Sequence, residues 1–127
     1  MTVKYPCVCC GRLTLDEPPG SHLICPVCFW EDDAVQLRWP DWGGGANKPS
    51  LIEAQGNFQR RGAVDELSVQ HVRAAKDDES TDPNWRPINP RQDTFEPRGV
   101  QLAEWPDDRT VLYWWRYRDP GAWIRQC

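Results

Sequence analysis

Helical periodicity stands out in the middle of the chain. Leu51, Ala54 and Phe58 recur at the spacing of one helix face. Ser50 precedes them and Glu53 follows it by three residues, which makes a capping box, in which each side chain accepts a hydrogen bond from the other residue's backbone N–H group. Two basic residues and then a glycine close the pattern at residue 62. The sequence therefore predicts a helix that begins after Ser50.

A second helix is predicted over residues 64–76, because Val64, Leu67, His71 and Ala75 fall on one stripe. The character of the chain then changes over residues 77–98, which begin with three acidic residues and contain four prolines. Proline lacks a backbone N–H group and restricts its own backbone, so regular structure is not expected there. We expect this segment to run extended over the surface as a connection.

Apolar and polar positions alternate on both sides of a turn in the last part of the chain. Val100–Trp105 and Thr110–Tyr117 flank Pro106-Asp107-Asp108, which predicts a β-hairpin. The second of these strands would carry aromatic side chains on both faces, so either both faces are covered or one of them binds a partner.

Residues 12–15 and 22–24 are also β-prone and are expected to pair as a hairpin with a longer loop. The expected fold class is α+β.

Cysteine spacing gives the strongest chemical signal. Cys7 and Cys10 form one Cys-x-x-Cys pair, and Cys25 and Cys28 form a second pair after a loop of fourteen residues. Two such pairs at this separation are typical of a zinc site with four thiolate ligands. A tetrahedral shell of four thiolates leaves no position for water, so the site is expected to be structural, in a small zinc-ribbon-like unit. We expect removal of the metal to unfold at least the N-terminal third of the chain.

Three other residues compete with this assignment. Cys9 is either a thiol activated by the neighbouring metal or a spare or alternative ligand, and the second interpretation is preferred. Cys127 is expected to be an idle thiol. His22 is a weak candidate ligand, since four thiolates already complete the shell.

Composition and charge limit the remaining possibilities. The mean hydropathy is −0.72, and no apolar run approaches the length of a membrane span. The N-terminus has no apolar stretch of the secretory kind, so we expect a cytoplasmic protein with reduced thiols. The formal net charge is −4, which argues against binding to nucleic acid through its phosphates.

An acidic triplet, Glu31-Asp32-Asp33, follows the second cysteine pair. It is interpreted as a solvated acidic face, rather than as a second metal site or an acid/base pair, because consecutive side chains point in different directions. The glycine run after residue 42 lacks the ending of a phosphate-binding loop. Carboxylates, tryptophans and arginines suit a protein interface, and the candidate partner-binding residues are Glu31, Asp32, Asp33, Trp39, Trp42, Trp114, Arg116 and Arg118.

The N-terminal half resembles a family of small bacterial cysteine-rich domains named after a Cys-Pro-Cys-Cys motif (CPCC). The resemblance covers about residues 5–63, and its most specific part is the block Cys-Pro-Val-Cys-Phe-Trp-Glu-Asp-Asp at residues 25–33. Val8 departs from the proline of the name motif but leaves every cysteine in place. The resemblance implies a metal-binding unit. Such families look at home among the accessory and immunity proteins of bacterial toxin systems.

We therefore expect a single domain, 1–127, made of a zinc-ribbon-like unit (5–48), a helical segment (50–76), a proline-rich connection (77–98) and a tryptophan-rich hairpin region (99–127). The leading hypothesis is a zinc-stabilised protein-binding module, an immunity or antitoxin protein that neutralises a bacterial toxin by direct binding. The alternative is a zinc-ribbon accessory factor that binds nucleic acid or the transcription machinery. A thiol enzyme that uses Cys9 ranks last, and we expect no enzymatic activity.

Overall fold

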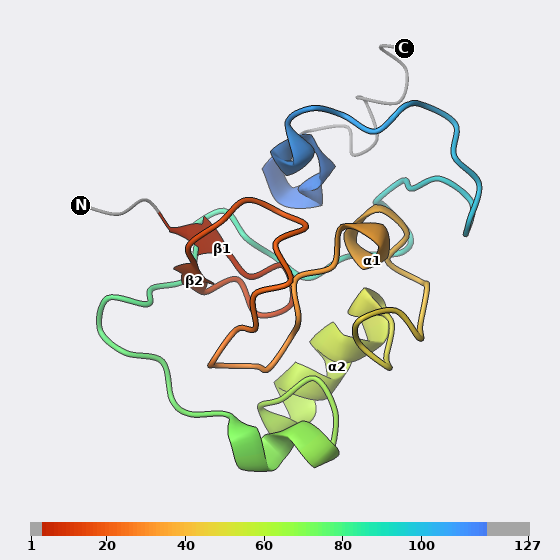
Figure 1. The fold of residues 1–127 in the computed structure, drawn as a ribbon. Coiled ribbons are helices and arrows are strands. Elements are labelled where there is room, and N and C mark those ends of the chain that lie inside the picture. The colour runs from red at the N-terminus through yellow and green to blue at the C-terminus, as the bar shows by residue number, and fades with distance from the viewer. Residues whose placement is uncertain (1–3, 117–127) are drawn as a thin grey trace.

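The computed structural model describes residues 4–116 as a small α+β structure (Figure 1). Its order of elements is β1 (Tyr5–Pro6), β2 (Leu13–Leu15), α1 (Ala34–Arg38), α2 (Leu51–Arg61) and three 3-10 helices, η1 (Leu67–His71), η2 (Arg109–Leu112) and η3 (Trp114–Arg116). In Figure 1, η2 and η3 lie above α1 and the β1–β2 pair, while α2 and η1 lie below them. No helix in the described part of the chain is long and apolar enough to span a membrane.

The predicted helix after Ser50 is confirmed as α2. The Ser50 side chain accepts a hydrogen bond from the Glu53 backbone, and the Glu53 side chain accepts one from the Ser50 backbone. The helix ends at Gly62, whose φ of 79° is the left-handed conformation that glycine adopts readily. The local end signals therefore fixed both boundaries of α2.

The predicted pairing of residues 12–15 with residues 22–24 is wrong. β2 pairs with β1 in antiparallel fashion, while Ile24 forms a bridge with Glu31. The reason is local, because each Cys-x-x-Cys turn closes a hairpin between the residues on its own two sides.

The predicted helix over 64–76 is also wrong, because this stretch forms only the short η1. Its two ends are tied to the second cysteine pair, since the N–H group of Val64 donates to the carbonyl of Cys28 and that of Arg73 donates to the carbonyl of Pro26. Leu67, which should face a core on the predicted stripe, is 76% exposed. Backbone anchoring to the cysteine pair therefore prevails over the apolar periodicity.

The predicted C-terminal hairpin is absent from residues 99–116, all of which the structure describes. Asp108 accepts a hydrogen bond from the Thr110 N–H group and so begins η2. The four consecutive residues from Leu112 to Trp115 are all buried, whereas a strand would alternate between two faces. The indole N–H groups of Trp114 and Trp115 donate to the Arg86 carbonyl and the Asp82 carboxylate, so the proline-rich segment covers them.

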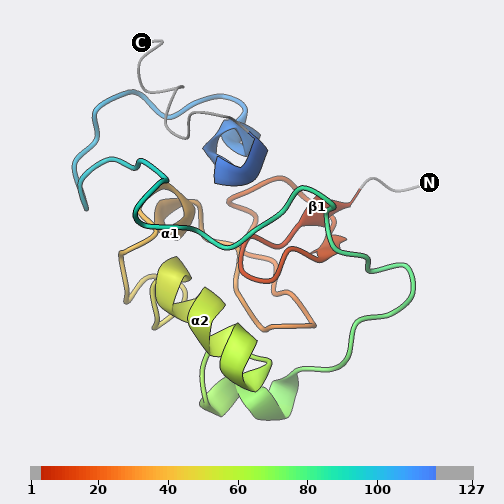
Figure 2. The ribbon, with the colours of Figure 1, turned by 180° about the vertical axis from the view of Figure 1, so that it is seen from behind.

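Residues 77–98 contain no helix or strand, as predicted. Figure 2 shows this segment crossing the back of the molecule, from the side of β1 to the side of α1. Its Thr81 forms a bridge with Arg12, and its Ile88 is buried in the core. One hydrophobic cluster contains the cysteines of the N-terminal unit, residues of α1 and α2, and the four residues from Leu112 to Trp115 where η2 ends and η3 begins. The proline-rich segment is therefore a packed part of the fold as well as a connection.

Candidate metal centre

Four cysteines meet in the interior. The Sγ atoms of Cys7, Cys10, Cys25 and Cys28 all lie within 4.8 Å of one another, and each residue is at most 5% exposed. The Sγ atoms of Cys7 and Cys28 are 3.5 Å apart, and those of Cys10 and Cys25 are 3.8 Å apart. A tetrahedral metal ion with bonds of about 2.3 Å places its sulfur ligands about 3.8 Å apart. These four residues could therefore hold a metal ion.

The two cysteine pairs sit on turns with the same backbone hydrogen bonds. In the first turn, the N–H group of Gly11 donates to the carbonyl of Cys7, and that of Cys7 donates to the carbonyl of Arg12. In the second turn, Phe29 donates to Cys25 and Cys25 donates to Trp30 in the same way. The short spacing therefore aims both sulfurs of each pair at one point, as the sequence predicted.

Each turn ends on a residue with positive φ. Gly11 has φ 81° and the equivalent Phe29 has φ 74°. A Cβ atom on Gly11 would lie 2.6 Å from the ring of Trp85, so this position requires glycine for space as well as for conformation. Phe29, by contrast, carries a side chain whose ring packs on His71.

The thiols of Cys7, Cys25 and Cys28 differ in their electrostatic surroundings. Burial raises the pKa of both Cys7 and Cys28 well above the ordinary thiol value. The pKa of Cys25 is instead strongly lowered, because its sulfur accepts hydrogen bonds from Cys10, from the other two thiols and from the Thr14 hydroxyl. Four buried thiolates repel one another without a counter-charge, and a divalent cation supplies it.

The other candidates are not among the four grouped sulfurs, although the thiol of Cys9 contacts that of Cys28. Cys9 is 1% exposed, and burial raises its pKa, which makes it a poor nucleophile. His22 is exposed, with its Nδ1 atom 3.2 Å from the Glu31 carboxylate. Cys127 lies outside the described residues.

The interpretation of Glu31-Asp32-Asp33 as a solvated acidic face is wrong, because two of its three carboxylates are buried. Asp32 is 2% exposed and accepts hydrogen bonds from the N–H and hydroxyl groups of Ser21. Burial raises the pKa of Asp32. Asp33 is 8% exposed and caps α1, accepting from the N–H groups of Val35 and Gln36. Asp32 and Asp33 therefore stabilise the fold and do not suit a docking surface.

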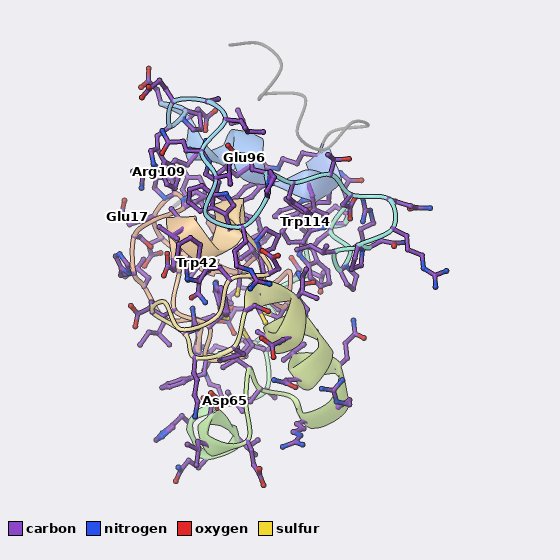
Figure 3. The ribbon with its side chains drawn as sticks, turned by 90° about the vertical axis from the view of Figure 1, so that its right-hand side faces the viewer. Glu17, Trp42, Asp65, Glu96, Arg109 and Trp114 are labelled. Atoms are coloured by element: carbon purple, nitrogen blue, oxygen red, sulfur yellow. The ribbon has the colours of Figure 1, made fainter. Side chains whose placement is uncertain are left out.

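The aromatic and basic candidates also divide into buried residues and residues that reach the surface. Trp39 and Trp114 are buried, and their indole N–H groups donate to the carbonyls of Val100 and Arg86. Trp42, labelled in Figure 3, is half-buried, and Arg116 is exposed with its guanidinium over the Tyr113 ring. Arg118 lies outside the described residues. Glu31, Trp42 and Arg116 are therefore the candidates that reach the surface.

Sequence reasoning missed a buried amide network behind the acidic triplet. The Gln36 side-chain amide donates to the carbonyls of Trp42, Asn47 and Pro49, and its oxygen accepts from the backbone and side chain of Asn47. The Asn47 side chain in turn binds both backbone groups of Glu31. This network fixes the glycine-rich loop against the second cysteine turn. The position of Asn47 at the end of the glycine run was the only available signal.

A buried ion pair was also missed. Arg38 of α1 donates from Nε and Nη2 to the carboxylate of Glu96, and both side chains are fully buried. The guanidinium also lies 4.7 Å from the centre of the Trp105 ring. The partners are 58 residues apart, so no sequence pattern connected them.

A known protein family matches the part of the chain that contains this centre. The family model described as Cysteine-rich CPCC matches residues 5–79, which include all four cysteines and reach beyond the resemblance seen in the sequence. The chain belongs to this cysteine-rich family. A comparison with curated proteins finds no match.

Proposed function

We propose that this protein is a zinc-stabilised protein-binding module that acts by docking, without catalysis, as an immunity or antitoxin protein in the cytoplasm. The observation that carries the proposal is the closed set of four buried sulfurs. With Cys7, Cys10, Cys25 and Cys28 as ligands, the shell of a zinc ion is complete and no position remains for water or substrate. A closed centre of this kind stabilises the fold that carries the docking surface.

Thiol chemistry favours zinc over the hard cations. Thiolates are soft ligands that select zinc, copper(I) or iron–sulfur clusters, while calcium and magnesium require oxygen ligands. The four Sγ atoms lie within 4.8 Å of one another, a separation that suits one ion at their centre rather than a larger cluster. A single zinc ion is the best match to four sulfurs at tetrahedral separations.

The surface supports docking to a protein. The net charge of −4 repels phosphate backbones and suits a basic partner. Large apolar side chains also reach the surface, among them Leu102 at 58% exposure and Leu67 at 76%. Carboxylates on the surface of a binding protein steer and orient a basic partner.

Co-expression tests this proposal. The protein would be produced together with each protein encoded beside its gene, and growth and complex formation would be measured. We expect one neighbour to be toxic alone, harmless with this protein and recovered in a complex with it. The variant Trp42→Ala should weaken the complex, while Gln59→Ala, an exposed change on α2, should not.

A second measurement separates docking from nucleic-acid binding. Single- and double-stranded DNA and RNA would be titrated with the metal-loaded protein over a series of salt concentrations. The proposal predicts no salt-dependent affinity. Salt-dependent binding together with the absence of a protein partner would contradict the docking role and favour the accessory-factor alternative.

A further inference from the structure

We propose that the pocket beside the metal centre binds a small organic anion with an apolar body, such as an aromatic carboxylate. The pocket has a volume of about 590 Å³ and lies between the first cysteine turn, the carboxyl end of α2 and residues 72–85. Small-molecule sites commonly have volumes of about 300–1,000 Å³. The lining residues that matter are Cys10, Arg12, Phe58, Arg61, Arg73 and Trp85.

The apolar part of the lining is fixed in place. The ring of Trp85 packs over Gly11, and its indole N–H group donates to the carbonyl of Val8. Phe58 is half-buried on α2 and packs against the core. Trp85 and Phe58 both line the pocket and are held in place by the fold, so the site for a flat apolar group is preorganised.

The charge of the lining contrasts with that of the chain. The pocket is lined by three arginines and by no aspartate or glutamate, although the whole protein carries a net charge of −4. Arg73 binds the carboxylate of Glu79 through both terminal nitrogens. Arg61 lies 3.4 Å from Glu66, whose side chain is 85% exposed, so this pair is weak.

Arg12 is the central cation of the pocket. The residue is half-buried, and its guanidinium donates one hydrogen bond, to the carbonyl of Glu79. Among residues 4–116 it forms no ion pair. A partly desolvated arginine gains most from a charged acceptor, because a carboxylate can accept two parallel N–H bonds from it. An anion in this pocket would therefore supply the counter-charge that the chain does not.

Calorimetric titration of the metal-loaded full chain tests the site. The probes are 2-naphthoate and the neutral 2-naphthamide, which share their apolar body and differ in charge. We expect naphthoate to bind with one site per chain and at least about tenfold more tightly than naphthamide. Equal affinities, or no saturable binding of naphthoate, would overturn the proposal.

Substitutions of Arg12 and Arg61 test whether naphthoate binds in this pocket, and Arg60, which lies on α2 like Arg61, provides the matched control. Arg12→Gln should weaken naphthoate binding by about tenfold or more, and Arg61→Gln, on the exposed rim, by about threefold. Arg60→Gln, next to the rim but outside the lining, should leave the affinity unchanged. Arg61→Gln keeps the test decisive if Arg12→Gln does not fold. Unchanged affinity in a folded Arg12→Gln protein, or in Arg61→Gln, would place the binding elsewhere and contradict the proposal.

Discussion

The ring of Phe29 stacks on the imidazole of His71, with 4.9 Å between ring centres and 22° between ring planes. Phe29 follows the second pair of metal-binding cysteine candidates, and His71 ends η1. The stack therefore ties the segment after α2 to the metal centre. It also explains why a phenylalanine with φ 74° occupies a position where the first turn has glycine.

Substitutions at Phe29 separate the contact from the backbone strain. Phe29→Ala loses the ring but keeps a Cβ atom at positive φ, whereas Phe29→Gly loses both the ring and the strain. We expect both variants to be less stable than the wild type, and Phe29→Gly to be more stable than Phe29→Ala by about 1 kcal/mol. Urea unfolding of the metal-loaded proteins measures this difference, and an Ala variant as stable as the Gly variant would contradict the strain.

The His71 side of the stack can be tested alone. His71→Ala should lower the free energy of unfolding by about 0.5–1.5 kcal/mol, the usual range for an aromatic pair. His22→Asn is the control, because His22 is exposed and packs on no ring among the described residues. Equal effects of the two substitutions would mean that the stack contributes nothing.

Gln36 should be among the least replaceable residues of the chain. Gln36→Leu leaves three carbonyl groups and two N–H donors of Asn47 without their partner in a buried place. Each unsatisfied group costs about 1–3 kcal/mol, so the total loss should exceed about 3 kcal/mol. Gln59→Leu makes the same change on the exposed face of α2 and should stay within about 0.5 kcal/mol of the wild type in thermal unfolding. A Gln36→Leu protein of wild-type stability would refute the network.

The Arg38–Glu96 pair connects α1 to the proline-rich segment. Burial raises the pKa of the Glu96 carboxyl, but the hydrogen bonds from Arg38 and from the Leu102 N–H group outweigh it, so the pKa lies below its ordinary value. Glu96 is therefore ionised at neutral pH. Glu96→Gln should cost about 3–5 kcal/mol at pH 7, because it leaves the Arg38 charge buried and uncompensated. Glu104→Gln, at an exposed site nearby in the chain, should have little effect, and similar losses in the two variants would count against the pair.

Features encoded by neighbouring residues could be predicted from the sequence. The metal centre follows from two turns in which the spacing alone aims the sulfurs, and α2 follows from Ser50 and Gly62 at its ends. The five residues of α1 are too few to show a helical pattern. The correct predictions therefore concern contacts between residues that are close together in the sequence.

Features that depend on distant contacts could not be predicted. The run from Leu112 to Trp115, one leucine and three aromatic residues, has the composition of a strand, yet it is buried under residues 77–98, which supply the acceptors for Trp114 and Trp115. Asp32 and Asp33 look like surface carboxylates until the fold brings Ser21 to Asp32 and the Ala46 N–H group to Asp33. In each case tertiary contacts prevailed over local preference.

Metal content is the most direct test of the central claim that Cys7, Cys10, Cys25 and Cys28 form a closed structural metal centre. Native mass spectrometry and circular dichroism would be recorded for the wild type, Cys10→Ser and Cys9→Ser, before and after chelation. We expect one zinc ion per chain in the wild type and in Cys9→Ser, loss of the ion in Cys10→Ser, and loss of folded structure whenever the ion is removed. A chelated wild type with an unchanged spectrum and thermal midpoint, or a Cys9→Ser protein that loses its metal as Cys10→Ser does, would contradict the claim.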